Sequence, residues 1–436
     1  MSCTQAASAD ILPGLVLSDQ QQAGLAALEA FVQSEERIFL LTGYAGTGKT
    51  TLLQALLTRL RHQGDRRRVA FTALSNKATK VLAAMADRWD LAVDCMTCCR
   101  LLGLRPVIDK DTGQQNFTAD SQRKALIHYY RLVVVDECSM INQEMWLLLV
   151  QAISDLSCTT QLLFVGDPAQ LPPVHETRSL CFDQIYARFD LTDVVRYGGA
   201  IGLLADSVRQ RLDQPILPSP VSQSNPNHTE GVFVVPRATW EQLLQRAFTS
   251  ATYAENPDQV RVLAYTNHRV QNLNQQIRQA IYGSTLARFV VGERLIAHSP
   301  CLQDESIILQ TSEECQVLDI TPGQVDQWQV WHLEVETETG QMRQLQVLHE
   351  AEAPRLKTQL QHLAAAREWR LFWSLKQRFH EVHYSYCLTV HKSQGSTFQD
   401  VFIDWPNLRL NRRVTERNQL YYVAVTRAAR RLFIPQ

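Results

Sequence analysis

The sequence has no run of 18 or more apolar residues and no excess of either sign of charge. A membrane-spanning helix needs about 20 mostly apolar residues, so no membrane partner is predicted. The 43 Lys and Arg residues against 44 Asp and Glu residues give a formal net charge of −1. This balance argues against a protein that coats nucleic acid by bulk charge, although it allows a local basic groove.

The sequence also lacks the signals of secretion and of a disulfide framework. Its first residues contain no positive segment followed by an apolar core, so we expect no secretory signal. The ten cysteines have no paired spacing, which predicts reduced thiols in a cytoplasmic protein. Cys95, Cys98 and Cys99 cluster, but no second Cys/His pair follows at ligand spacing, so packed cysteines are a better interpretation than zinc.

A glycine-rich stretch gives the first positive signal. "GYAGTGKTT" follows the apolar run "RIFLL" and precedes a helical pattern, which is the context of the P-loop pattern G-x-x-x-x-G-K-[ST]. Lys49 is predicted to reach the β- and γ-phosphates of ATP, and the Thr50 hydroxyl to ligate Mg²⁺. The other candidate nucleotide contacts of the loop, where backbone N–H groups can point at phosphate oxygens, are Gly43, Ala45, Gly46, Thr47, Gly48 and Thr51.

Two further apolar runs end in polar residues. After "RLVVV", Asp136 is predicted to bind Mg²⁺ and Glu137 to orient or deprotonate the attacking water, which favours ATP hydrolysis over phosphate transfer to a small acceptor. "TQLLFVGDPAQLPPV" places Gln170 on a turn at the same sheet edge, where an amide can sense the γ-phosphate. No Asn-Lys-x-Asp stretch is present to bind guanine.

The order of the motifs resembles superfamily 1 helicases of the RecD/Dda-like branch over nearly the whole chain. The matching stretches are, in order, "LSDQQQAGL", "GYAGTGKTT", "TALSNKATKVL", "MTCCRLLGL", "VVVDECSM", "GDPAQLPPV", "LTDVVR", "YCLTVHKSQGSTFQDVFI" and "YYVAVTRAARRLFI". The resemblance implies that Gln21 contacts adenine, that Gly395 belongs to the nucleotide site, and that Arg196 and Arg427 sense phosphate through their planar guanidinium groups. Tyr197 stands where the family often has Gln.

The resemblance also implies contacts with a nucleic-acid strand. The residues that match the family's strand-binding motifs are Ser75, Asn76, Lys77, Thr97, Thr389, His391, Lys392, Ser393 and Gln394. The chain departs from the family after Thr97, since "TCCR" stands where a Thr-x-His-Ser pattern is usual.

The predicted fold is α/β, with two RecA-like parallel-sheet domains that hold one ATP between them. The first domain is predicted over residues 1–102 and 125–196, and the second, which has no P-loop, over 197–282 and 381–436. The turn pattern of residues 103–124 predicts an inserted β-hairpin, and the resemblance implies that this hairpin separates strands. Phe117 is predicted near its tip, as the residue on which a base stacks or, alternatively, packed against a domain. Residues 283–380 contain the hairpin pattern "QWQVWHLEVETETGQMRQLQVLH" and a helical pattern, and resemble an inserted SH3-like β-barrel with helices.

These expectations describe an ATP-dependent DNA helicase. The resemblance implies translocation on single-stranded DNA in the 5′ to 3′ direction, separation of strands at duplex junctions, a monomer, and DNA-replication or repair proteins as candidate partners. Two alternatives stay open at this point. One is an RNA or RNA–DNA helicase on the same scaffold, since no motif tests for the 2′-hydroxyl. The other is a nucleic-acid-dependent ATPase that separates no strands.

Overall fold

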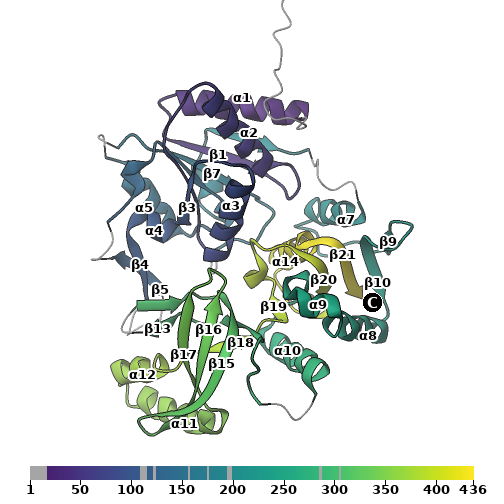
Figure 1. Cartoon of the computed structure of the whole chain (residues 1–436). Coiled ribbons are helices and arrows are strands. Elements are labelled where there is room, and N and C mark those ends of the chain that lie inside the picture. Colours follow the sequence, from purple (N-terminus) through teal and green to yellow (C-terminus); the bar gives the residue numbers. More distant parts are fainter. Residues whose placement is uncertain are drawn as a thin grey trace, which may run out of the picture. The chain divides into compact units, whose positions relative to one another are not determined.

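The computed structural model describes residues 17–108, 115–120, 124–155, 158–173, 176–193, 199–283, 287–303 and 306–436. The chain divides into two compact units, each of which is described separately (Figure 1). The first unit comprises Met1–Arg105, Thr118–Ser219 and Arg413–Thr426. The second unit comprises Pro106–Phe117, Pro220–Arg412 and Arg427–Gln436.

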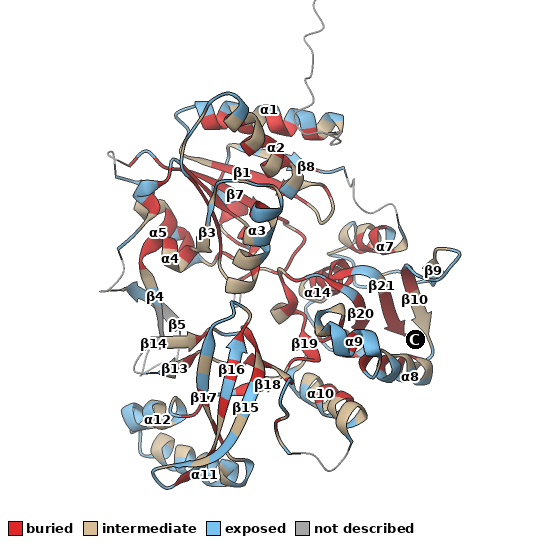
Figure 2. Cartoon of the chain, viewed as in Figure 1, coloured by how far each residue is buried: buried red, intermediate tan, exposed pale blue. Residues whose placement is uncertain are grey.

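The first unit contains a six-stranded parallel sheet in the order β3-β2-β6-β7-β1-β8. Its strands are β1 (Ile38–Gly43), β2 (Val69–Ala73), β3 (Asp94–Thr97), β6 (Leu132–Val135), β7 (Gln161–Gly166) and β8 (Arg188–Leu191). Every residue of β2, β6 and β7 is buried, which explains why their sequences are mostly apolar. Figure 2 shows this burial for β7.

The helices of the first unit lie before, between and after these strands along the chain. They are α1 (Asp19–Gln33), α2 (Lys49–His62), α3 (Asn76–Arg88), α4 (Cys98–Leu102), α5 (Gln143–Ile153), α6 (Cys181–Gln184), α7 (Ala200–Arg209) and α14 (Val414–Thr426). Helix α2 buries Leu52, Leu53, Leu56, Leu57 and Leu60 against the core, and each such side chain contributes about 1.5–3 kcal/mol on burial. The apolar face of α2 therefore fixes the P-loop, which precedes it, to the sheet.

Two segments pack with the first unit although the sequence assigned them to the second domain. These segments, 199–219 and 413–426, contain α7 and α14. The Asn418 side-chain amide of α14 donates hydrogen bonds to the backbone carbonyls of Arg211, Leu212 and Gln214. The Arg209 guanidinium of α7 lies 3.9 Å from the ring centroid of Tyr44 in the P-loop. A helical sequence pattern identifies both helices but does not identify the unit against which they pack.

The second unit contains another six-stranded sheet, in the order β19-β11-β20-β21-β10-β9. Its strands are β9 (Gln223–Ser224), β10 (Gly231–Val235), β11 (Val260–Ala264), β19 (Cys387–Thr389), β20 (Phe398–Ile403) and β21 (Ala428–Pro435). All pairs are parallel except β9 with β10. The accompanying helices are α8 (Arg237–Phe248), α9 (Ala251–Glu255), α10 (Asn267–Tyr282) and α13 (Trp405–Leu408). The prediction of two α/β units is confirmed.

An antiparallel sheet is inserted into the second unit, in the order β17-β16-β15-β12-β18. Its strands are β12 (Arg294–Ala297), β15 (Glu314–Val325), β16 (Trp328–Thr337), β17 (Met342–Leu348) and β18 (Val382–Tyr384), and it is accompanied by the pair β13 (Cys301–Gln303) and β14 (Ser306–Leu309) and by helices α11 (Ala353–Ala365) and α12 (Trp369–Lys376). The predicted hairpin around the Thr-Gly turn is β16–β17, with Gly340 at φ +70°. The His380 N–H donates to the Gln346 carbonyl, which joins β17 to the residue that leads into β18. This hydrogen bond links the two edges of the sheet, as in a closing barrel. The SH3-like assignment stays a prediction.

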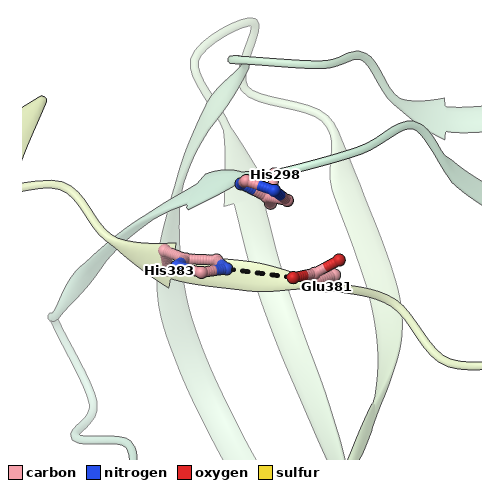
Figure 3. Close-up of side chains that lie close together, drawn as sticks. All are labelled: His298, Glu381 and His383. Carbon is pink, nitrogen blue, oxygen red and sulfur yellow. Dashed lines mark hydrogen bonds and ion pairs between the residues drawn. The ribbon is translucent and has the colours of Figure 1, made fainter. Parts of the chain in front are cut away.

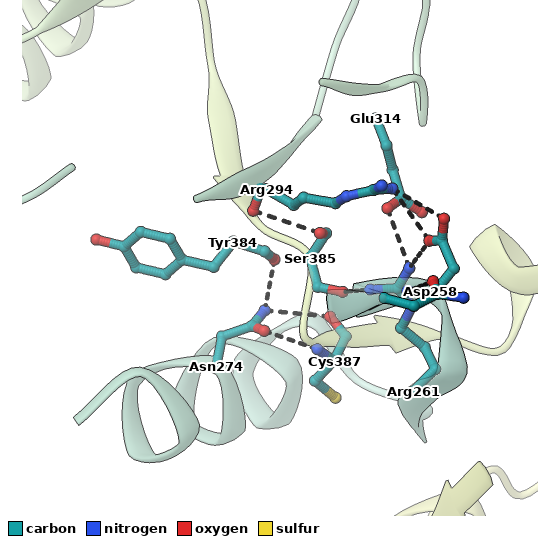
Figure 4. Close-up of polar contacts among 9 residues, drawn as sticks. Asp258, Arg261, Asn274, Arg294, Glu314, Tyr384, Ser385 and Cys387 are labelled. Atoms are coloured by element: carbon teal, nitrogen blue, oxygen red, sulfur yellow. Dashed lines mark hydrogen bonds and ion pairs between the residues drawn. The ribbon is translucent and has the colours of Figure 1, made fainter. Parts of the chain in front are cut away.

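A buried ion pair joins the inserted sheet to the parallel sheet of the second unit (Figure 4). Arg261 of β11 and Glu314 of β15 are each 1% or less exposed, and their charged groups are 3.1 Å apart. Arg261 also donates to the Ser385 carbonyl and to Asp258, which in turn accepts from Arg294. Removing one partner of a buried pair typically costs about 3–5 kcal/mol, so this cluster holds the insertion firmly on the sheet.

The predicted hairpin between residues 103 and 124 is present as β4 (Leu104–Ile108) paired with β5 (Gln115–Ala119). The intervening turn lies outside the described residues. Phe117 is the third residue of β5 and is half-buried. The structure therefore places Phe117 within a strand, whereas the sequence placed it near the tip.

None of the helices within the described ranges combines the length and apolar character needed to cross a membrane. In the same ranges every cysteine is a free thiol.

Candidate functional site

The carboxyl ends of the first unit's parallel strands lie at one edge of the sheet, and each delivers a predicted motif there. The P-loop follows β1, Asp136 and Glu137 follow β6, and Gln170 follows β7. In the sheet order β6, β7 and β1 are neighbours, so the candidate ATP residues come from adjacent strands. Open α/β sheets bind ligands at this edge.

The P-loop has the backbone that its glycines allow. Gly46 and Gly48 have φ of +83° and +87°, which other residues rarely adopt. A Cβ atom on Gly43 would lie 2.5 Å from the Thr47 hydroxyl oxygen, so only glycine fits. Thr47 is fully buried, and its hydroxyl donates to the Tyr44 carbonyl over 2.9 Å. Thr47 therefore shapes the loop from inside.

Lys49, the first residue of α2, folds back over the loop. Its ammonium donates to the Gly43 carbonyl over 2.5 Å and to the Tyr44 carbonyl over 3.1 Å. These two carbonyls hold the Lys49 ammonium at the mouth of the loop. Phosphate oxygens bound there would be stronger hydrogen-bond acceptors than the carbonyls. Thr50, the next residue, is exposed.

The acidic pair after β6 has the electrostatics of a cation site. Removal from solvent raises the pKa of Asp136 to about 7, the charge of Glu137 adds to this rise, and Lys49 opposes it. A divalent cation bound beside the carboxylate would remove this cost, so the residues fit Mg²⁺. Glu137 has φ +51° in the left-handed region. Such conformations are costly for residues other than glycine and cluster at functional sites.

Gln170 follows β7, the neighbour of the strand that carries these acids, and its amide has an unused acceptor. The side chain is buried, and no hydrogen-bond partner for its carbonyl oxygen occurs in the part of the chain that is described. A buried amide oxygen without a partner costs about 1–3 kcal/mol, and a water or ligand group would satisfy it. This geometry suits the predicted sensing role.

Asp167 and Tyr422 are site residues that the sequence analysis missed. The Asp167 carboxylate accepts from the Ala45 N–H of the P-loop over 3.0 Å and from the Tyr422 hydroxyl of α14 over 2.7 Å. The Tyr422 hydroxyl also accepts from the Ala45 N–H over 2.9 Å. Burial raises the pKa of Asp167, while Lys49 and the Tyr422 hydrogen bond act in the opposite sense. The three groups tie the P-loop to the "GDPAQLPPV" stretch and to α14.

Weak signals for both residues existed in the sequence. Asp167 stands in the quoted stretch "GDPAQLPPV", next to the apolar end of β7, where a buried carboxylate needs partners. Tyr422 lies in the apolar stretch "YYVAV", in which a tyrosine is easily taken for a core residue.

Gln21 is buried, and both ends of its side-chain amide are hydrogen-bonded. Its amide nitrogen donates to the Thr47 carbonyl over 3.1 Å, and its amide oxygen accepts from the Ser18 N–H over 3.0 Å in a capping box. A Cβ atom on Gly48 would lie 2.2 Å from the Gln21 amide nitrogen. Gln21 thus braces the P-loop against α1, and its contact with adenine stays a prediction.

Only one of the two arginines predicted to sense phosphate lies within the described residues. Arg196 lies outside the described residues. Arg427 is in the second unit, 6% exposed, and donates to the Ser396 carbonyl over 3.0 Å. Gly395, one residue before Ser396, has φ +74°. Arg427 therefore supports the turn that carries Gly395, and its phosphate contact stays a prediction.

The predicted strand-binding residues of the first unit lie at the same sheet edge, on β2, which is the neighbour of the strand β6 that carries the acids, and on β3, the strand beyond it. Ser75 follows β2 and Thr97 ends β3, and these strands are neighbours with Ala73 opposite Thr97. Each hydroxyl caps a helix: Ser75 accepts from the Ala78 N–H, and Thr97 from the Arg100 N–H. The N-termini of α3 and α4 thereby bring polar N–H groups to this edge, which suits phosphate binding. Asn76 and Lys77 are half-buried in the first turn of α3.

The predicted strand-binding residues of the second unit, in "YCLTVHKSQGSTFQDVFI", are only partly accessible. Ser393 is fully buried and donates to the Val390 carbonyl over 2.8 Å, so its side chain shapes the turn instead of facing a strand. Thr389 and Gln394 are also buried, whereas His391 and Lys392 are half-buried. Burial lowers the pKa of Lys392, while Glu381 opposes this effect.

Comparison with known proteins places these motifs in a family. Residues 16–210 match the model described as an AAA domain, and residues 384–434 match the UvrD-like helicase C-terminal domain. The RecD subunit of the RecBCD enzyme from Mycobacterium tuberculosis is 31% identical over 203 residues, which cover 41% of this chain and 33% of that subunit. These matches support a RecD/Pif1-like helicase of superfamily 1 that hydrolyses ATP. The matched stretch spans about a third of the RecD subunit's length.

Two further comparisons bear on this helicase's extent and fold. An uncharacterised protein of Acanthamoeba polyphaga mimivirus is 23% identical over 494 residues, which cover 95% of this chain and 98% of that protein. A crystal structure of Pif1 helicase from Bacteroides with ADP-AlF3 and single-stranded DNA has a TM-score of 0.50 and 13% identity, with 96% and 92% of the chains covered. A structure of Pif1 helicases at forked DNA gives 0.51 and 14% over the same coverage. These likenesses confirm the predicted RecA-like fold.

The hydroxyl of Tyr422 can be tested separately from its ring. In the helicase, Tyr422→Phe is expected to lower the free energy of unfolding by about 1–3 kcal/mol, because the buried Asp167 loses a donor. The KM for ATP should rise, because the Ala45 N–H loses an acceptor that positions the P-loop. Denaturant unfolding and steady-state ATPase assays measure both effects. Tyr186→Phe, at an 86% exposed tyrosine of the same unit, is the control. Unchanged stability and KM in Tyr422→Phe would contradict the assignment.

Proposed function

We propose that this helicase uses ATP to translocate on single-stranded DNA in the 5′ to 3′ direction and separates duplex strands ahead of it. One observation carries the proposal. The same edge of one sheet holds the ATP residues after β1, β6 and β7 and the capped, polar ends of the adjacent strands β2 and β3. A nucleotide and a phosphate backbone bound along this edge would be linked through rigid neighbouring strands.

The proposed ATP chemistry assigns a role to each group at the edge. Lys49 would bind the β- and γ-phosphates, and Glu137 would hold and deprotonate the attacking water. Thr50 and Asp136 would hold Mg²⁺, which when bound supplies positive charge to the phosphate oxygens. Gln170, with its unpartnered amide oxygen, would sense the γ-phosphate. Arg427, from the other predicted domain, and Arg196, at the end of the first, would add guanidinium charge.

The proposed strand contacts depend on helix N-termini and hydroxyls. The N–H groups at the starts of α3 and α4 are oriented by Ser75 and Thr97 and would hold phosphates without reading sequence. The β4–β5 hairpin would separate the strands, with Phe117 as the stacking residue. Structures of Pif1 helicases with single-stranded DNA support a DNA strand as the substrate. The direction of movement rests on the resemblance to the RecD/Dda-like branch alone.

Partial duplexes with a single-stranded tail test the proposal. We expect strand separation with ATP on duplexes carrying a 5′ DNA tail and little or none with a 3′ tail. Efficient unwinding from the 3′ tail would overturn the direction. Unwinding that occurs only with RNA tails would favour an RNA helicase, and DNA-stimulated ATP hydrolysis without unwinding on either tail would favour a translocating ATPase.

A further inference from the structure

Three potential metal ligands gather on one face of the inserted sheet, away from the ATP residues in the sequence. His298 follows β12, and Glu381 and His383 lie on the segment that forms β18 (Figure 3). Their ligand atoms all lie within 4.8 Å of one another. Within the described ranges this is the one His, Cys, Asp and Glu group of three with such spacing.

The pairing of the strands explains why these side chains converge. Strands β12 and β18 are antiparallel, with Ala297 opposite Val382, and the His298 N–H donates to the Glu381 carbonyl over 2.8 Å. His298 and Glu381 are therefore opposite each other, and His383 is two residues farther along β18. Side chains at opposite and i, i+2 positions share a face of a sheet. The backbone thus fixes the directions of all three side chains.

The distances suit a tetrahedral ion. With bonds of about 2.0–2.1 Å to nitrogen and oxygen, adjacent ligand atoms on a tetrahedral Zn²⁺ are about 3.3 Å apart. The His383 imidazole and the Glu381 carboxylate are already 3.3 Å apart. The His298 and His383 rings have centroids 4.7 Å apart. The third ligand needs only a small side-chain rotation, which its half-buried position permits.

The ligand types select the class of metal. Two imidazoles with one carboxylate suit zinc and similar borderline divalent ions, whereas Mg²⁺ prefers oxygen ligands. Three protein ligands leave a fourth coordination position open. A small cavity beside the cluster is lined by His298, His383, Thr389 and Lys392, so that position would face two predicted strand-binding residues. The positive charge of the Lys392 ammonium disfavours a metal cation at this site. The negative charge of the Glu381 carboxylate offsets that repulsion.

We propose that His298, Glu381 and His383 form a site for a borderline divalent metal such as Zn²⁺, with its open position toward Thr389 and Lys392. The site is separate from the predicted Mg²⁺ ligands Thr50 and Asp136, which lie in the other unit. Nothing in the proposed helicase reaction requires this second metal. Metal binding can therefore be tested independently of unwinding.

Cobalt provides the probe because its visible absorption reports coordination geometry. The full chain, treated with a chelator and then dialysed, is titrated with Co²⁺ at pH 7. We expect one equivalent with a tetrahedral spectrum that Zn²⁺ displaces. His383→Ala and Glu381→Gln should each weaken binding at least about tenfold, because loss of even an outer-shell partner of a metal typically costs 10–100-fold. His362→Ala, at an exposed histidine on α11, should bind like the parent chain.

The cysteines are the main competitors, and their spectrum separates them. Burial raises the pKa of the Cys95 and Cys99 thiols to about 11, so both stay protonated at pH 7. An intense near-ultraviolet thiolate band, or equal Co²⁺ affinity in the parent, His383→Ala and Glu381→Gln proteins, would overturn the proposal. Failure of the parent chain to bind Co²⁺ or Zn²⁺ would also overturn it. The melting temperature of each variant is measured, and Glu381→Gln, which preserves shape, keeps the test valid if His383→Ala unfolds.

Discussion

Replacing Glu137 by glutamine is expected to lower DNA-stimulated ATP turnover by at least about 100-fold while ATP binding stays close to that of the parent enzyme. A positioned general base typically contributes 10²–10⁴-fold, and glutamine keeps the shape of the side chain but cannot take a proton. Glutamine also removes the negative charge that helps to raise the pKa of Asp136, so Mg²⁺-dependent ATP binding should not suffer. Nucleotide binding by fluorescence and turnover on single-stranded DNA measure the two properties separately.

Two other substitutions serve as comparisons for Glu137→Gln. Glu255→Gln alters an exposed glutamate of α9 in the second unit and should leave both binding and turnover unchanged. Lys49→Ala removes the ammonium at the mouth of the P-loop and should weaken ATP binding itself. Parent-like turnover in Glu137→Gln would show that another group activates the water.

The sequence predicted well those features in which a local pattern has one structural outcome. The apolar runs before Gly43, Asp136 and Gly166 became the buried strands β1, β6 and β7 because parallel strands covered on both faces are apolar throughout. The glycines of the P-loop became the turns with positive φ because few other residues adopt that backbone. Because parallel strands share one carboxyl edge, these local predictions were enough to place the ATP residues together.

Features that depend on distant parts of the chain could not be predicted in this way. Asp167 and Tyr422 are 255 residues apart, and only the fold brings the hydroxyl to the carboxylate. The metal-ligand group joins His298 to Glu381 and His383 through the pairing of two strands, and no local spacing indicates it. Ser393 matched a family motif by sequence, but its burial depends on how the turn after β19 packs. In each case the missing information was a tertiary contact.

Replacing Arg427 by alanine is expected to reduce ATP turnover by about 1,000-fold or more and to leave DNA affinity without nucleotide nearly unchanged. An arginine that stabilises the transferring phosphate is typically worth about 10³–10⁵-fold in rate. The prediction requires the helicase to bring this arginine of the second unit to the ATP phosphates during turnover. Steady-state ATPase measurements and oligonucleotide binding by fluorescence anisotropy provide the two readouts.

The position of Arg427 also demands a structural control. Its side chain is 6% exposed and donates to the Ser396 carbonyl, so alanine would leave that carbonyl unpaired and create a cavity. Arg427→Lys retains a charge and a donor but loses the planar fork that binds phosphate, so its melting temperature should fall less than that of the alanine variant while its turnover stays low. Arg430→Ala, at an exposed arginine of the same strand β21, should behave like the parent enzyme.

The pattern across the three arginine variants separates a phosphate contact from the two other roles that its position allows. A lowered melting temperature with proportional loss of turnover and DNA binding in both Arg427 variants would mean that the residue only supports the Gly395 turn. Loss of DNA affinity with parent ATPase activity would move Arg427 to the strand-binding surface. Low turnover in Arg427→Lys with parent-like stability and DNA affinity can arise only if the guanidinium itself acts on the nucleotide, since the charge and the buried donor are then still present.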